Sequence, residues 1–171
     1  HLSCEAVSLV HNGIIENHEA LRQELTEQGY HFESETDTEV MAHLIHHLVA
    51  ACGDFRQGVS QALTRLEGAY AIAVQHRDFP DRLIGARQGS PLVVGLGIGE
   101  NFIASDPQAL RPVTDRFIYL EEGELVELTR SEVSIFGGRE TSVASRAVTL
   151  DSRDDAADKG AFRHFMLKEI Y

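Results

Sequence analysis

Three segments in the first part of the chain place apolar residues at helical spacing. The first runs from His18 to about Gln28, with Leu21 and Leu25 on one face and Gly29 as its stop. The second carries the longest buried stripe, which consists of Val40, Met41, Leu44, Ile45, Leu48 and Val49. The third carries Val59, Ala62, Leu63 and Leu66. The pattern predicts three helices with one apolar face each.

Polar residues at the helix starts agree with this reading. Asn17 and Asp54 stand where a side chain caps the first and third helices. Thr36 followed by Glu39 has the spacing of a capping box, and Gly53 ends the second helix.

The remaining apolar runs are short and bounded by turn residues, as strands are. A first strand is predicted at residues 6–10, and a nearly continuous apolar run at 69–74 predicts a strand covered on both faces. Glu121–Glu124 reads as the turn of a hairpin between two further strands. The other predicted strands are 82–87, 92–96, 101–105, 117–120, 125–128 and 135–136, with one helical turn at 107–110.

Beyond Gly137 the periodicity ends. Residues 137–160 are rich in Ser, Thr, Arg, Asp and Ala and predict a linker or surface excursion, whereas Phe162–Tyr171 returns to helical spacing. Helices combined with a mostly antiparallel set of strands predict an α+β layered domain.

The amino-acid composition excludes several functional classes. The chain has 171 residues, 43% of them apolar, enough for one domain with a real core. Its formal net charge of −12 argues against nucleic acid or an anionic membrane as a partner. Two cysteines and no secretory leader favour a reducing, cytoplasmic setting, and no apolar run is long enough to span a bilayer.

Asn12-Gly13 is the stretch with most chemical content. It follows the first predicted strand and precedes a helix, and it joins a side-chain amide to a conformationally free backbone N–H. Two such donors suit a developing oxyanion. Asn-Gly is also the commonest two-residue turn, and the dipeptide alone favours the turn. The helix that follows, in place of a partner strand, makes the catalytic reading stronger.

Asp37 stands at the start of the second helix and has two readings. A carboxylate there interacts favourably with the positive end of the helix dipole. It would equally suit a cationic group such as a substrate ammonium. Local pattern leaves the two readings even.

Other candidate residues give weaker functional signals. His43, His46 and His47 share one helix, but no carboxylate or cysteine completes a metal set, so solvated helix surface is the favoured reading. Cys4 directly precedes the first strand and is read as structural and not as a nucleophile. No cofactor or metal is expected.

Several segments, in one order along the chain, resemble class II glutamine amidotransferases. They cover nearly everything except residues about 137–157. They are Val10–Asn17, Ser34–Val40, Gly68–Tyr70, Ala86–Leu92, Gly99–Asp106, Tyr119–Gly123, Asp158–Gly160, Arg163-His164 and Met166–Ile170.

The resemblance implies a four-layer αββα sandwich of the N-terminal-nucleophile hydrolase type and L-glutamine as substrate. Asn12 (side-chain amide) and Gly13 (backbone N–H) would form the oxyanion hole, and Asp37 would bind the α-ammonium of glutamine. In this family the nucleophile is an N-terminal cysteine whose own α-amine acts as the general base.

The same resemblance predicts that the chain is a piece of a longer enzyme. Residues 1–155 would be a glutaminase domain incomplete at its N-terminus, and 156–171 the start of the connection to a sugar-isomerase domain that receives the ammonia. The parent would be a cytoplasmic homodimer. Because position 1 is His and not the nucleophilic cysteine, the chain alone is expected to be inactive. Loss of the first strands should leave unpaired sheet edges and an exposed core face.

Two alternatives stay open from the sequence. One is a branch of the same family that transfers phosphoribosyl groups, since it shares the Asn-Gly element. The other is a ligand-binding domain that kept the fold without catalysis.

Overall fold

The computed structural model describes residues 2–3, 5–137 and 143–150. The helices of this part are α1 (His18–Glu27), α2 (Asp37–Cys52), α3 (Phe55–Leu63), the 3₁₀ turn η1 (Pro107–Leu110) and α4 (Val143–Arg146). The strands are β1 (Leu2–Ser3), β2 (Val7–Ile15), β3 (Gly68–His76), β4 (Leu83–Gln88), β5 (Val93–Leu96), β6 (Asn101–Ala104), β7 (Arg116–Tyr119), β8 (Leu125–Leu128), β9 (Val133–Phe136) and β10 (Val148–Thr149).

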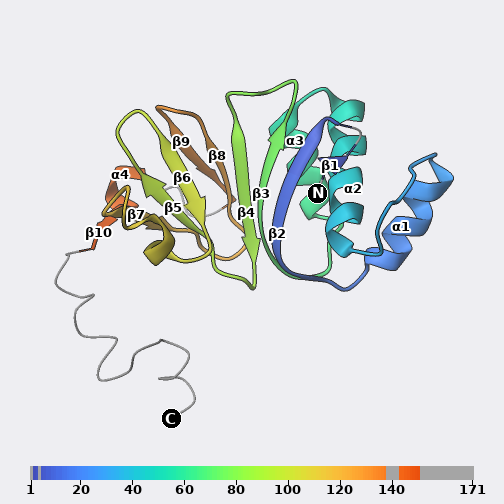
Figure 1. Ribbon diagram of the computed structural model, residues 1–171, viewed down its shortest axis with the longest axis horizontal. Helices are drawn as coiled ribbons and strands as arrows, with labels where there is room; N and C mark the ends of the chain where they lie inside the picture. Colours follow the sequence, from blue (N-terminus) through green and yellow to red (C-terminus); the bar gives the residue numbers. More distant parts are fainter. Residues whose placement is uncertain (1, 4, 138–142, 151–171) are drawn as a thin grey trace, which may run out of the picture.

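The strands form two antiparallel sheets that pack face to face. One has six strands in the order β1-β2-β3-β4-β8-β9, and the other has four in the order β10-β7-β5-β6. Figure 1 shows α1, α2 and α3 on one side of the six-stranded sheet and the four-stranded sheet on its other side. The α+β layered architecture predicted from the sequence is therefore confirmed.

Three apolar clusters hold these layers together. The largest lies between the helices and the six-stranded sheet and contains the α2 stripe, for example Met41 and Leu44, both fully buried. A second cluster lies between the sheets around Val94, Ile118 and Val126. The third covers the outer face of the four-stranded sheet, where Leu110 of η1 packs with buried Val93 and Phe117 of the sheet.

The helix boundaries follow local chemistry, as predicted. The Thr36 hydroxyl accepts a hydrogen bond from the Glu39 N–H, and the Asp54 carboxylate accepts one from the Gln57 N–H. Gly53 ends α2 in the left-handed conformation, with φ of 71°. Asn17 differs, because its side chain makes no cap: it donates to Arg65 O and accepts from Glu67 N, tying the start of α1 to the turn before β3.

Two predictions about the strands were wrong. Residues 117–120 and 125–128 do not form a hairpin, since β7 belongs to the four-stranded sheet and β8 to the six-stranded sheet. The intervening residues carry the chain from one sheet to the other. The first strand does not end at Val10 either: β2 continues to Ile15 and pairs with β3 over its whole length.

The predicted linker at 137–160 is also wrong in part. Within it, Val143–Arg146 is helical and Val148–Thr149 pairs with β7 at the edge of the four-stranded sheet. The Arg146 guanidinium anchors this segment by donating to both carboxylate oxygens of buried Glu124. The predicted helix at Phe162–Tyr171, the proposed boundary at 155/156 and Cys4 lie outside the described residues.

Candidate functional site

Gly13 lies inside β2, opposite Tyr70 of β3, in a backbone conformation that only glycine adopts readily. Its φ is +137°, and a Cβ built on it would lie 2.0 Å from the carbonyl oxygen of Ala69. The Asn-Gly pair is therefore part of a paired strand and not a turn, because the two strands approach too closely at Gly13 to admit a side chain.

A second glycine makes the same close approach from the other strand. Gly68 has φ of +126° and pairs with Ile15, and a Cβ there would lie 2.3 Å from Ile14 O. These two glycines fix the spacing of β2 and β3 beside Asn12. The Gly68–Tyr70 segment thus has a structural reason for its place among the family-like motifs.

Asn12 is exposed and lines a cavity of about 230 Å³ between the two sheets. Ala71 of β3 and Ile103 of β6 line the same cavity. Two apolar side chains of β2 are largely exposed: Val10 is 66% exposed and Ile14 69%. Apolar side chains on both sides of Asn12 are therefore open to solvent.

Asp37, the first residue of α2, reaches the same stretch of β2. Its Oδ2 accepts a hydrogen bond from the Ile15 N–H at 2.9 Å, and its Oδ1 accepts one from the Thr38 hydroxyl at 3.3 Å. The carboxylate keeps 21% of its side-chain surface exposed. Asp37 therefore contacts Ile15 and His11, the residues of β2 on either side of the Asn12–Ile14 stretch, although they lie more than twenty positions away in the chain.

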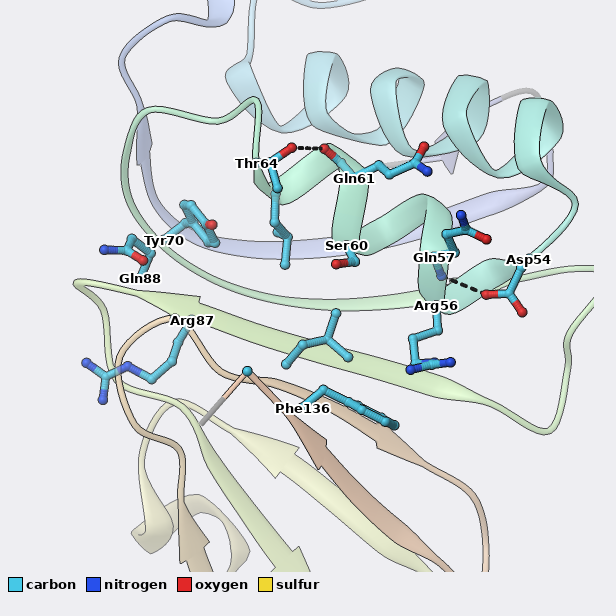
Figure 2. A pocket seen from close by; sticks show the side chains of 14 residues that line it. Asp54, Arg56, Gln57, Ser60, Gln61, Thr64, Tyr70, Arg87, Gln88 and Phe136 are labelled. Atoms are coloured by element: carbon cyan, nitrogen blue, oxygen red, sulfur yellow. Dashed lines mark hydrogen bonds between the residues drawn. The ribbon is translucent and has the colours of Figure 1, made fainter. Parts of the chain in front are cut away.

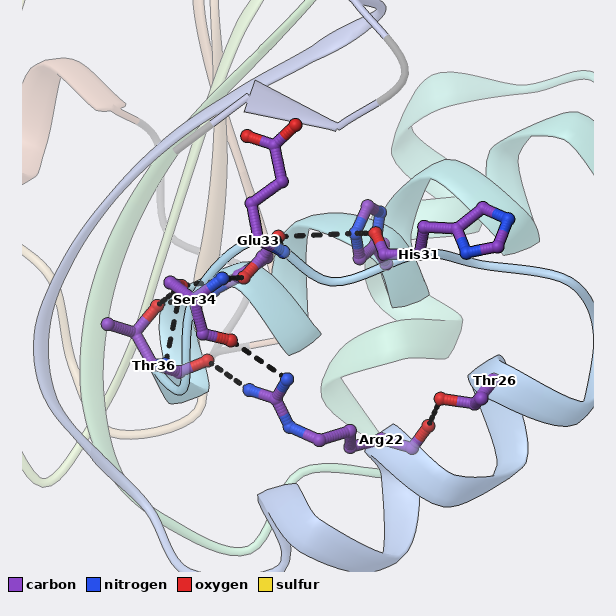
Figure 3. Close-up of polar contacts among 8 residues, drawn as sticks. Arg22, Thr26, His31, Glu33, Ser34 and Thr36 are labelled. Atoms are coloured by element: carbon purple, nitrogen blue, oxygen red, sulfur yellow. Dashed lines mark hydrogen bonds and ion pairs between the residues drawn. The ribbon is translucent and has the colours of Figure 1, made fainter.

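The loop before α2 is held by Arg22, which sequence analysis did not single out, and by Glu39 (Figure 3). The Arg22 guanidinium donates to Ser34 O at 2.9 Å and to Thr36 O at 3.2 Å. The buried Glu39 carboxylate accepts from the N–H groups of Glu33 and Ser34, both at 2.7 Å. Together they fix the path of the chain into Asp37.

The electrostatics of this loop favour an ionised Glu39. Burial opposes ionisation of this carboxyl, but the hydrogen bonds donated by Glu33 and Ser34 outweigh it and lower the pKa of Glu39. The ionised Glu39 carboxylate therefore reaches back along the chain and holds the loop at Glu33 and Ser34.

The prediction of a solvated helix surface was wrong for His43, whereas His46 and His47 are partly exposed. His43 is 5% exposed and packs against the rings of Tyr30 and Phe32. His46 Nδ1 lies 2.7 Å from the Tyr30 hydroxyl. Spacing within α2 did not reveal this burial, because Tyr30 and Phe32 of the preceding loop cover His43. Within the described residues, no group of three or more His, Cys, Asp or Glu side chains is arranged to hold a metal ion.

Buried imidazoles make the stability of the fold pH-dependent. Burial is the main cause that lowers the pKa values of His43, His46 and His76. In the unfolded chain they titrate near pH 6.5, so below that the unfolded state binds protons that the folded state excludes. We expect the urea concentration at the midpoint of unfolding to decrease as the pH is lowered from about 7.5 to about 5.5. An unchanged midpoint would contradict this assignment.

A matched variant and a pH window separate this effect from carboxyl titration. Glu24, Glu39 and Glu124 have lowered pKa values, so their contribution is lost only at more acidic pH. The substitution His76→Gln should reduce the dependence of stability on pH between about pH 7.5 and about pH 5.5, because it removes one of the buried titrating rings.

A larger cavity, of about 660 Å³, lies elsewhere (Figure 2). It is bounded by α3 and by side chains of β4 and β9, and the Arg56 guanidinium stacks 4.4 Å from the centre of the Phe136 ring at its edge. Asn12, Gly13 and Asp37 are not among its lining residues. The volume of a cavity therefore does not by itself identify the candidate functional site.

Two sheets packed face to face and a helical layer give the chain the fold of an amidotransferase domain of the N-terminal-nucleophile hydrolase type. A family model described as a glutamine amidotransferase domain matches residues 2–112. The chain belongs to the glutamine amidotransferase family.

The similar curated proteins are glutamine–fructose-6-phosphate aminotransferases (isomerizing). That of Pseudomonas putida is 55% identical over 171 residues, which is 100% of this chain and 28% of the relative. That of Bordetella pertussis is 58% identical over 165 residues, or 96% of this chain and 27% of the relative. The chain thus spans little more than a quarter of the length of these relatives.

Two solved structures share this fold. The glutamine phosphoribosylpyrophosphate amidotransferase of B. subtilis, complexed with ADP and GMP, matches with a TM-score of 0.65 and 29% identity, over 75% of this chain and 28% of that one. A structure described as the allosteric regulatory enzyme of purine biosynthesis gives 0.65 and 27%, over 78% and 29%. Identity to the aminotransferases is about twice as high, which favours the aminosugar branch.

Among the described residues, no helix is both long and apolar enough to cross a membrane.

Proposed function

We propose that residues 1–155 belong to the glutamine-hydrolysing domain of a glutamine–fructose-6-phosphate aminotransferase and that 156–171 begin the connection to its sugar-isomerase domain. The observation that supports the proposal is the hydrogen bond from the Ile15 N–H to Asp37, which holds the carboxylate beside the strand that carries Asn12-Gly13. A cytoplasmic, homodimeric parent is part of the same proposal.

The proposed oxyanion hole uses two donors from neighbouring residues. Ile15 N–H points away from β3, because it donates to Asp37. Since N–H groups two residues apart in an antiparallel strand point the same way, we expect the Gly13 N–H to face the open edge too. Asn12 would add its side-chain amide, and both donors would stabilise the negative oxygen formed at the glutamine amide carbon.

The nucleophile is proposed to come from a cysteine segment that precedes this chain in the complete protein. Cys52 does not fit, because it ends α2, roughly 22 Å along the helix axis from Asp37. The thiolate would attack the amide carbon, and the C–N bond would break as the amide nitrogen takes up the proton given up by the thiol and leaves as ammonia. Water would then cleave the thioester to give glutamate. Residues 1–171 alone would not carry out this reaction.

Asp37 is proposed to bind the α-ammonium of glutamine, and Asp37→Asn in the complete protein tests the proposed function. The substitution keeps the size of the side chain but removes its charge. We expect the KM for glutamine to rise by about 10–100-fold, the value of a charge-assisted hydrogen bond, with a much smaller change in kcat. Steady-state glutamate release measures both constants.

Asp54→Asn is the matched control, since Asp54 also stands at a helix start but caps α3 at the far cavity. Asn caps a helix as well as Asp, so this variant should keep a normal KM. A second control is glutaramate, the substrate analogue without the α-amino group. It should react equally poorly with wild type and Asp37→Asn. An unchanged KM for glutamine in Asp37→Asn would refute the proposed role of the site.

A further inference from the structure

His11 is a buried titratable group beside the proposed site that the oxyanion chemistry does not use. Its side chain is 2% exposed and lies between β2 and the start of α2. The ring Nδ1 is 3.1 Å from the Thr38 hydroxyl oxygen and 3.8 Å from Asp37 Oδ1. The His11 ring is therefore linked to the Asp37 carboxylate through one intervening side chain, that of Thr38.

The direction of these hydrogen bonds follows from the donors available. The Thr38 hydroxyl donates its only proton to Asp37 Oδ1, so its oxygen is left to accept from His11 Nδ1–H. The neutral ring then keeps Nε2 as an acceptor. Burial, opposed by the nearby Asp37 charge, lowers the pKa of His11 and favours this neutral form.

Packing alone does not favour an imidazole at this position. His11 Nε2 is buried and has no hydrogen-bond partner among the described residues. An acceptor buried in that way destabilises a fold, whereas an aliphatic side chain of similar size would avoid the loss. The benefit of the ring therefore lies at its other nitrogen, on the side of Thr38 and Asp37.

Asp37 needs both of its oxygens held if it is to present a fixed surface to a ligand. Ile15 N–H holds Oδ2 and the Thr38 hydroxyl holds Oδ1. Each carboxylate oxygen has two lone pairs, so one on each remains for a ligand. Without the second contact the carboxylate is free to turn about its bond to Cβ.

We propose that His11 is a positioning residue that acts through Thr38 to fix the Asp37 carboxylate for the α-ammonium of glutamine. The inference rests on the proposed function of Asp37. It adds two side chains to the site, His11 on β2 and Thr38 on α2. They connect the strand that carries Asn12-Gly13 with Asp37. His11 itself touches neither substrate nor reacting atoms.

The test uses four variants of the complete protein: His11→Leu, His11→Asn, Thr38→Val and Thr38→Ser. Leu and Val remove the hydrogen bonds, whereas Asn retains a donor near the place of Nδ1 and Ser retains the hydroxyl. We expect His11→Leu and Thr38→Val to raise the KM for glutamine about 10-fold and to change kcat by less than roughly twofold. Asn and Ser should restore most of the affinity.

Thermal stability and a double variant separate positioning from a merely structural role. His11→Leu should melt at the same temperature as wild type or higher, because it removes the unpartnered acceptor. His11→Leu combined with Thr38→Val should be no worse than Thr38→Val alone, since both break one chain of contacts. A lower melting temperature with unchanged KM, or His11→Asn behaving like His11→Leu, would overturn the inference.

The Asp37→Asn result separates this failure from failure of the proposed function. If Asp37→Asn raises the KM while His11→Leu and Thr38→Val do not, only the positioning role is lost. If Asp37→Asn itself leaves the KM unchanged, the proposed function fails first.

Discussion

Replacement of Gly13 by alanine should abolish glutamine hydrolysis in the complete protein and destabilise this domain by on the order of 4 kcal/mol. The added Cβ would lie 2.0 Å from Ala69 O, and φ at this position is +137°. The contact is with backbone in the middle of a β2–β3 ladder, so no flexible side chain is available to move aside. Calorimetric melting and glutamate release would report the two effects.

Gly99→Ala is the matched control for backbone strain. Gly99 also has a positive φ, +73°, but a Cβ there meets nothing within 4 Å. Only the left-handed conformation itself is then penalised, by about 1–2 kcal/mol, which lowers the melting temperature by a few degrees. If Gly13→Ala were no more damaging than Gly99→Ala, the close approach of β2 and β3 would not constrain the site as described.

The helices were predictable because their determinants are local. The apolar stripe of α2, its cap at Thr36 and its stop at Gly53 all lie within or next to the helix, and each forms as the spacing indicates. The cap of α3 at Asp54 is equally local. Such signals need no knowledge of the rest of the fold.

Sheet membership was not predictable, because it depends on contacts between distant segments. Apolar runs on both sides of Glu121–Glu124 have the appearance of a hairpin, yet β7 pairs with β5 and β8 pairs with β4. Their inner residues Ile118 and Val126 meet in one apolar cluster between the sheets. A turn signal predicts a change of direction and leaves open the sheet that the next strand joins.

The residues of the candidate site likewise form two groups, those that the sequence predicted and those that it did not. Asn12, Gly13 and Asp37 were predicted from the sequence, with the resemblance deciding between their local alternatives. Arg22 and Thr38, which support Asp37, were missed because the first acts across helices and the second carries no motif of its own. Supporting residues become visible only when the chain segments they connect are placed in space.

Asn12→Ala should lower kcat for glutamine hydrolysis by about 10²–10³-fold in the complete protein, with little change in KM. The proposed amide donor acts on an oxyanion that exists only in the transition state and the tetrahedral intermediate, so substrate binding does not depend on it. Because Asn12 is exposed, its truncation leaves no cavity in the core, and the melting temperature should stay near that of wild type.

Ser8→Ala is the control for Asn12→Ala, since Ser8 is an exposed polar residue four positions earlier on β2. It should leave both kinetic constants unchanged, because Ser8 pairs near the β1 end of the strand, away from Asp37. The contrast with Asp37→Asn is sharper still. Loss of the Asp37 charge should act on KM and loss of the Asn12 amide on kcat, because one meets the ground-state ammonium and the other the developing oxyanion. If Asn12→Ala raised KM and spared kcat, Asn12 would be a binding group, and the oxyanion would need another donor.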